Sequence, residues 1–199
     1  MKWATEALIH FDRVVSAWLI VRFIDPEAEF IFLAPDDQTP EDTILFGLPN
    51  VPLAAHSGGT TTFQRVLNAY SLTDPALIAL AQVVADVVSH VMQDSHRAQL
   101  AQRHEWTGGV LGVAEGIMLL SADDTECLDR SLPIYDALYA RLQAEAEIQR
   151  ASPNSTQKVL EKTVRFAQGV RDLRKREEEF SPAAFKASLG ATVGTLPRC

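Results

Sequence analysis

The chain has 199 residues, of which 47% are hydrophobic, and its acidic side chains outnumber the basic ones by eight. This composition is sufficient for one sizeable core with an appendage, and the acidic balance argues against a general nucleic-acid binder, because phosphate binding requires a supply of Lys and Arg. The two cysteines, Cys127 and Cys199, make neither a disulfide framework nor a zinc motif.

No segment is typical of a secretory signal or of a membrane span. Residues 1–12 contain Lys2 and Glu6 and lack a long apolar run. The most hydrophobic region, residues 108–122, is interrupted by Glu115, and no run of about eighteen residues is both apolar and uncharged. We therefore expect a soluble, cytoplasmic protein with no membrane partner.

Residues 12–28, DRVVSAWLIVRFIDPEA, predict a helix that is apolar on nearly every side, which is typical of a buried element. Asp12 is the expected N-cap, and Pro26 should end the helix because it disfavours helical geometry at the preceding residue. Asp12, Arg13 and Arg22 place charge in or beside the predicted core. Because buried charges must be paired or used, these side chains either hold the helix in place or belong to a ligand site.

Short strands are predicted on both sides of this helix. The first covers residues 1–5, and the second covers residues 29–33 (EFIFL), which are aromatic and branched. Two more are predicted over residues 43–48 and 51–55, separated by a Pro-Asn turn.

The remainder of the core is predicted to be helical. A helix is expected over residues 62–70, capped by threonine, and a second begins at Asp74-Pro75 and continues with helical spacing to Val91. Residues 108–121 and 125–148 predict two further helices. The fold class is therefore α+β, with a small β-rich N-terminal layer around a buried helix and a helical C-terminal half.

The C-terminal segment differs from the core in composition. Residues 151–156 form a polar linker, and residues 158–176 predict a helix in which basic residues outnumber acidic ones. We predict a domain at residues 1–148, and a linker, basic helix and loose tail at residues 149–199. The basic helix is either a solvated surface element or an arm that binds a partner.

Several polar side chains have the spacing or context of metal ligands. Asp86 and His90 lie at i and i+4 of a predicted helix and share a face, either as a ligand pair or as an ordinary polar face. His56 precedes a Ser-Gly-Gly loop, and Glu105 stands at another element boundary. Loops of this kind leave room for a ligand, although a satisfied loop histidine has the same sequence.

Nucleophilic and phosphate-binding chemistry receives little support. Cys127 follows Asp124 and Glu126, whose negative charge should raise the pKa of its thiol and oppose thiolate formation. The sequence contains no GxSxG elbow, no Walker loop and no GxGxxG after a strand.

Residues 12–32, DRVVSAWLIVRFIDPEAEFIF, closely resemble the opening signature of the chromate-resistance proteins of the ChrB C-terminal type, in which a DR-ASAWLI-RFIDPEA-F-F pattern begins the domain. The resemblance continues through shorter motifs and does not cover the tail. These motifs are Phe46-Gly47, His56 with Gly58, Thr62-Phe63, Leu72 with Asp74-Pro75-Ala76-Leu77, Asp86, Glu105 with Gly108, and Asp136-Ala137-Leu138-Tyr139.

The resemblance implies a soluble bacterial domain that is encoded with chromate-efflux functions, and that is fused to a regulatory part in some members and stands alone in others. Some stand-alone relatives are linked to superoxide dismutation, which implies bound iron or manganese. The sequence departs from the family pattern at four positions. Gln64 replaces a carboxylate, Ala85 an imidazole and Val88 another carboxylate, and Val21 stands where an Arg is common. The first three substitutions remove ligands that a shell for a hard metal would use.

The leading hypothesis is a stress-response protein, an accessory of chromate resistance, that binds a metal ion or an oxyanion in a polar site. Arg13 and Arg22 are the expected anion-binding residues, because the guanidinium fork matches two oxygens at once. The side chains expected to support the site are Asp12, Trp18 and Gln64. Those expected to bind metal are His56, Asp86, His90 and Glu105.

Two other functions are left open. The chain is either a metal-dependent enzyme similar to superoxide dismutase, for which no catalytic residue is identified, or a non-enzymatic regulatory or interaction module. The second alternative would use the basic helix at residues 158–176, the one segment expected to bind nucleic acid. A homo-oligomer is compatible with each hypothesis.

Overall fold

The computed structural model describes residues 1–55, 59–92 and 107–151, together with Val164 and Ala167. The chain separates into two compact units, residues 1–136 and residues 137–199. The predicted boundary at residue 148 stays a prediction, and the predicted basic helix lies outside the described residues except at Val164 and Ala167.

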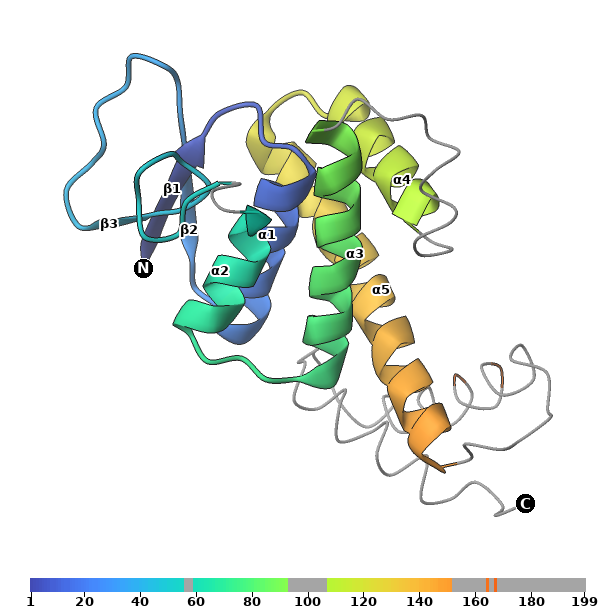
Figure 1. The fold of residues 1–199 in the computed structure, drawn as a ribbon. Helices are drawn as coiled ribbons and strands as arrows, with labels where there is room; N and C mark the ends of the chain where they lie inside the picture. Colours follow the sequence, from blue (N-terminus) through green and yellow to red (C-terminus); the bar gives the residue numbers. More distant parts are fainter. Residues whose placement is uncertain (56–58, 93–106, 152–163, 165–166, 168–199) are drawn as a thin grey trace. The chain divides into compact units, whose positions relative to one another are not determined.

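A three-stranded parallel sheet forms the N-terminal layer (Figure 1). Strand β1 (Lys2–Glu6) lies in the middle and pairs with β2 (Glu29–Leu33) on one side and β3 (Thr43–Leu45) on the other. Ala4 is opposite Ile31 in one ladder and opposite Leu45 in the other. Because parallel neighbours require a crossover connection, the helix between β1 and β2 is held against the sheet.

The predicted fourth strand, at residues 51–55, is wrong, and the third is shorter than predicted. After β3, Phe46 and Leu53 form only an isolated bridge. Asn50 has a positive φ of 61°, so the chain turns sharply there. Pro52 has no N–H to donate to a ladder, which prevents a regular strand.

Helix α1 (Phe11–Phe23) is the buried element that the sequence predicts, and ten consecutive residues from Phe11 to Ile20 are buried. The prediction that Asp12 caps this helix is wrong. The N-cap position is His10, whose side chain makes no capping hydrogen bond, so Asp12 lies inside the first turn. The Asp12 carboxylate caps a different helix instead, as described below.

Four more helices follow in the described residues, and the capping signals predicted for the first two are confirmed. Helix α2 (Thr62–Ala69) is capped by Thr61, whose side chain accepts a hydrogen bond from the Gln64 N–H. Helix α3 (Pro75–Met92) begins after Asp74, whose carboxylate accepts from the Ala76 N–H at 2.8 Å. The last two helices are α4 (Thr107–Leu120) and α5 (Asp124–Ala151). Residues 124–136 of α5 belong to the first unit.

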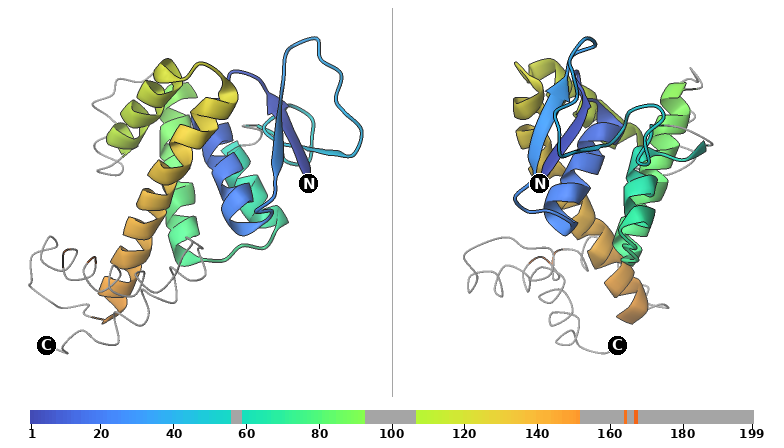
Figure 2. Two further views of the ribbon diagram at one scale, coloured as in Figure 1. Left: turned by 180° about the vertical axis from the view of Figure 1, so that it is seen from behind. Right: turned by 90° about the vertical axis from the view of Figure 1, so that its left-hand side faces the viewer.

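Helix α1 lies between the sheet and α3 in the ribbon views (Figures 1 and 2) and contacts α2, α3 and α4. Its Trp18 is fully buried, as are Trp3 of β1 and Phe63 of α2. The predicted α+β class is therefore confirmed.

Helix α3 is long and apolar enough to cross a membrane by length and composition alone. Half of its residues are nevertheless buried among other elements, including Leu77, Leu80, Val84 and Val87. This packing is typical of the core helix of a globular domain.

Candidate functional site

The buried charge of Asp12 is satisfied by the start of α2. Its two carboxylate oxygens accept hydrogen bonds from the backbone N–H groups of Thr62 at 2.9 Å and Phe63 at 3.1 Å, and the residue is only 2% exposed. The first N–H groups of a helix have no partner within it, and the helix dipole favours a negative charge there. Asp12 therefore joins α1 to α2 across about fifty residues of sequence.

Arg13 is held among internal acceptors. Its guanidinium donates to the carbonyl oxygen of Glu6 at 2.9 Å, to the Glu6 carboxylate at 3.3 Å and to the carbonyl oxygen of Leu8 at 3.2 Å. Burial lowers the pKa of Arg13, and the carboxylates of Glu6, Asp124 and Asp12 oppose this effect. The arginine thus fixes the connection between β1 and α1.

Arg22 is paired with a carboxylate on α5. Its Nε and Nη2 atoms donate to the two oxygens of Asp136 at 2.9 and 2.8 Å, which is a bidentate pair. Trp18, one helical turn earlier, donates its indole N–H to the same carboxylate at 2.8 Å. Asp136 therefore receives three hydrogen bonds from one face of α1.

These contacts bear on the predicted anion site. Arg13 and Arg22 donate to backbone carbonyls and carboxylates of this chain. The Arg13 guanidinium holds the connection between β1 and α1, whereas the Arg22 guanidinium joins α1 to α5. Anion binding by Arg13 and Arg22 stays a prediction, and it would require these internal bonds to be exchanged. Asp12 and Trp18, predicted to support the site, make the helix contacts described above.

Two of the predicted metal ligands are described, and both are buried. Asp86 is 9% exposed and His90 is 8% exposed, one turn apart on α3. Gln82 donates its side-chain N–H to Asp86 at 3.1 Å. Among the described residues, no Lys or Arg forms an ion pair with Asp86.

The other predicted ligands, His56 and Glu105, lie outside the described residues. In the part of the chain that the structure describes, no three His, Cys, Asp or Glu side chains come together as a metal-binding group. Gln64, predicted as site support, donates its side-chain N–H to Asn68 on the exposed side of α2. A site containing all four predicted ligands stays a prediction.

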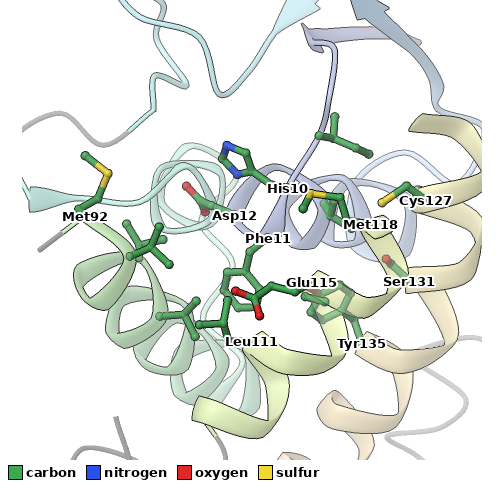
Figure 3. Close-up of a pocket in the computed structure, with 16 residues that line it drawn as sticks. His10, Phe11, Asp12, Met92, Leu111, Glu115, Met118, Cys127, Ser131 and Tyr135 are labelled. Atoms are coloured by element: carbon green, nitrogen blue, oxygen red, sulfur yellow. The ribbon is translucent and has the colours of Figure 1, made fainter. Parts of the chain in front are cut away.

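A cavity of about 320 Å³ lies among α1, α3, α4 and the first part of α5 (Figure 3). Its walls are mostly apolar, and Glu115 of α4 points towards the centre of the group in this view. Val88, one of the departures from the family pattern, is part of the wall. The described lining residues are Ile9, His10, Phe11, Asp12, Val14, Val87, Val88, Val91, Met92, Leu111, Ala114, Glu115, Met118, Cys127, Ser131 and Tyr135.

Two acids in this wall are kept neutral by their surroundings. Burial raises the pKa of the Cys127 thiol, and the charge of Asp124 adds to the effect. The predicted influence of Asp124 is therefore confirmed, with burial as the larger cause. Burial also raises the pKa of Tyr135. Cys127 is thus poorly suited to act as a nucleophile at neutral pH.

Sequence reasoning did not select Asp136, His10 or Glu115 as site residues. The signal for Asp136 was its place in one of the shared family motifs, together with the i, i+4 spacing of Trp18 and Arg22, which puts two donors on one helix face. The cavity has no signal in the sequence, because its walls come from four separate helices.

Comparison with known proteins identifies the family. A family model described as the C-terminal domain of ChrB matches residues 3–142, from β1 into α5. The chain belongs to this chromate-resistance family. The resemblance seen at residues 12–32 is confirmed, as is its limit, because residues after 142 are outside the match.

A curated relative within this family is Protein ChrB of Cupriavidus metallidurans, which is 30% identical over 144 residues. The match covers 72% of this chain and 41% of that protein, so the chain spans about two fifths of the length of its ChrB relative. No solved structure shows a significant match.

Proposed function

We propose that this member of the ChrB C-terminal domain family is an accessory protein of chromate resistance that binds a metal ion, with Asp86 and His90 as two of the ligands. The proposal rests on one observation. A carboxylate and an imidazole, both buried, stand one turn apart on α3, and no Lys or Arg of the described residues neutralises the carboxylate.

Burial of the Asp86 carboxylate has an energetic cost. A carboxylate removed from water loses its hydration, and buried carboxylates in proteins are normally paired with a cation or bound to a metal. Gln82 donates to Asp86 from a neutral amide, and among the described residues no Lys or Arg supplies a compensating charge. A divalent cation would provide that compensation, and His90 at i+4 presents a nitrogen ligand on the same face.

The donor set indicates the class of metal. One carboxylate oxygen and one imidazole nitrogen suit iron, manganese or zinc better than soft thiophilic ions. His56 and Glu105, which would add another nitrogen and another carboxylate, are proposed to complete the shell. Gln64, Ala85 and Val88 contribute no carboxylate or imidazole, so the site is expected to bind more weakly than a full shell would.

A cation fits the surroundings better than an oxyanion does. The two arginines that could attract an oxyanion already donate to Glu6, Leu8 and Asp136. The chain also carries a net charge of −8. Its average field therefore attracts cations and repels chromate-like anions.

The proposal is tested by metal uptake of the full chain. Protein stripped with a chelator is titrated with Fe²⁺, Mn²⁺ and Zn²⁺ under anaerobic conditions, and binding is measured by calorimetry and by elemental analysis after gel filtration. Asp86→Asn and His90→Gln should each weaken binding by about 10- to 100-fold. Asp129→Asn removes an exposed carboxylate from α5 and serves as the control, which should bind like the unaltered protein.

Failure to bind any of the three metals, or equal binding by Asp86→Asn and Asp129→Asn, would contradict the proposal. Folding is monitored in parallel by circular dichroism, so that loss of the site is separated from loss of structure. Superoxide dismutation is then assayed only with protein that has taken up iron or manganese.

A further inference from the structure

The cavity among α1, α3, α4 and α5 is separate from the proposed metal ligands, because neither Asp86 nor His90 belongs to its described lining. Its volume is about 320 Å³. Protein interiors are close-packed, with few voids larger than a water molecule, and an apolar cavity of about 150 Å³ stays dry and binds benzene. A space about twice that size has room for two fused rings.

Aromatic rings and thioethers line this cavity. Phe11 of α1 and Tyr135 of α5 both contribute to the wall (Figure 3), and their rings meet edge to face with centroids 6.3 Å apart. Met92 of α3 and Met118 of α4 add their side chains to the same wall. Thioethers adapt to ligands of different outline and make favourable contacts with aromatic rings, and aromatic rings attract one another in edge-to-face or offset arrangements. The wall therefore favours a ring compound.

The polar groups of the wall already have partners within the protein. The Asp12 carboxylate accepts from two N–H groups of α2, and His10 and Glu115 each have an interaction of their own. The Cys127 thiol has Ser131 as a hydrogen-bond partner, and burial raises its pKa, so it is neutral. Among the described lining residues none is Lys or Arg. A charged ligand would lose its hydration here without meeting a counter-charge that is still available, which is unfavourable in an apolar setting.

We propose that this cavity binds an uncharged, apolar aromatic compound of about two fused rings, packed against Phe11, Leu111 and Met118. The removal of the apolar surface of the ring from water supplies the binding free energy. A cation and an anion built on the same ring should both bind poorly, which distinguishes this cavity from a site that selects one sign of charge. This inference goes beyond metal binding and does not depend on it.

The test compares three probes that share the indole ring and differ in charge. At neutral pH 3-ethylindole is uncharged, tryptamine is a cation and indole-3-acetate is an anion, and their side arms are of similar size. Each probe is titrated into the full chain, and affinity is measured by calorimetry and ligand-observed NMR. The uncharged probe should bind at least about tenfold more tightly than either charged probe, which corresponds to about 1.4 kcal/mol.

A matched pair of variants on α4 separates this site from non-specific binding. Ala114 lines the cavity, whereas its neighbour Val113 is 47% exposed and lies outside the lining. Ala114→Phe puts a ring into the cavity and should weaken 3-ethylindole by about tenfold or more, while Val113→Phe should bind it like the unaltered protein. If circular dichroism shows that Ala114→Phe does not fold, Met118→Trp replaces it with the same expected loss, because that lining position is 43% exposed and tolerates a larger side chain.

Three results would overturn the inference. Tryptamine or indole-3-acetate binding as tightly as 3-ethylindole would exclude a cavity that selects uncharged compounds. Equal affinity of the cavity variant and Val113→Phe for 3-ethylindole would place the binding elsewhere. Absence of saturable binding by all three probes, in protein shown to be folded by circular dichroism, would exclude a small-molecule site of this class.

Discussion

Arg22 of α1 donates to both carboxylate oxygens of Asp136 of α5, at 2.9 and 2.8 Å, across more than a hundred residues of sequence. Both side chains are partly buried, with 24% and 19% exposed. This ion pair joins α1 to α5 at Asp136, the last residue of the first unit. The Trp18 indole N–H strengthens the connection by donating to the same carboxylate. Partly buried bidentate pairs of this kind are stronger than surface ion pairs.

The first prediction concerns this pair. Asp136→Asn should lower the free energy of unfolding by about 2–3 kcal/mol, because it leaves the Arg22 charge without its counter-charge. Urea denaturation followed by circular dichroism measures the change. Asp129→Asn, an exposed residue of the same helix, should alter stability by no more than about 0.5 kcal/mol. Equal effects of the two substitutions would show that the ion pair is not stabilising.

The second prediction concerns Asp12. Asp12→Asn should destabilise the protein by about 1–2 kcal/mol, because an amide oxygen accepts fewer bonds than a carboxylate and carries no charge to match the α2 dipole. Hydrogen exchange of the Thr62 and Phe63 amides should become faster. Metal uptake should be unchanged relative to the unaltered protein, and a selective loss of metal affinity without destabilisation would assign Asp12 to a ligand site instead.

The third prediction compares two glycines with positive φ. Gly47 has φ +67° and Gly59 has φ +75°, so Ala is strained at both positions. A Cβ at Gly47 would lie 2.8 Å from Cγ of Arg13, whereas a Cβ at Gly59 meets nothing within 4 Å. Gly59→Ala should cost about 1 kcal/mol and Gly47→Ala about 2–3 kcal/mol, because only the second also displaces the Arg13 stem. Thermal unfolding of both variants, run together, gives the comparison, and equal losses would exclude the steric term.

The fourth prediction concerns Cys127 and pH. Because the native pKa of its thiol is raised, the folded state holds this proton more tightly than the unfolded state does. Its contribution to stability is therefore complete at neutral pH and declines as pH rises above the ordinary thiol value of about 8.5. In a Cys199→Ser background, alkylation of folded protein at pH 8.5 should be much slower than alkylation in urea.

Comparable alkylation rates in the folded and urea-unfolded protein would contradict a protected thiol. Both reactions should also be run at pH 7 with the same reagent. This comparison separates the effect of thiolate formation from the effect of reagent access to the buried sulfur, because the alkylation rate of the folded protein should increase with pH at a higher midpoint than that of the unfolded protein.

Local chemistry in the sequence was sufficient for most of the elements. Apolar residues on every side predicted the burial of α1, Thr61 and Asp74 marked the starts of α2 and α3, and aromatic and branched residues predicted β2. Each of these signals depends only on residues close together in the sequence, so it can be recognised without knowledge of the tertiary structure. The same local reasoning was wrong at residues 51–55, where the predicted strand is reduced to an isolated bridge at Leu53 because Pro52 has no N–H to donate to a ladder.

The sequence by itself determined the family, the α+β class and the presence of buried charge in α1, because these follow from residue types and their spacing. Only the tertiary structure decided which partner each charge has. Asp12 caps α2, Arg13 holds the β1–α1 connection, and Arg22 pairs with Asp136. The physical reason is that a charged side chain in a core is satisfied by whatever donor or acceptor packing brings within about 3 Å, and that neighbour need not be close in sequence.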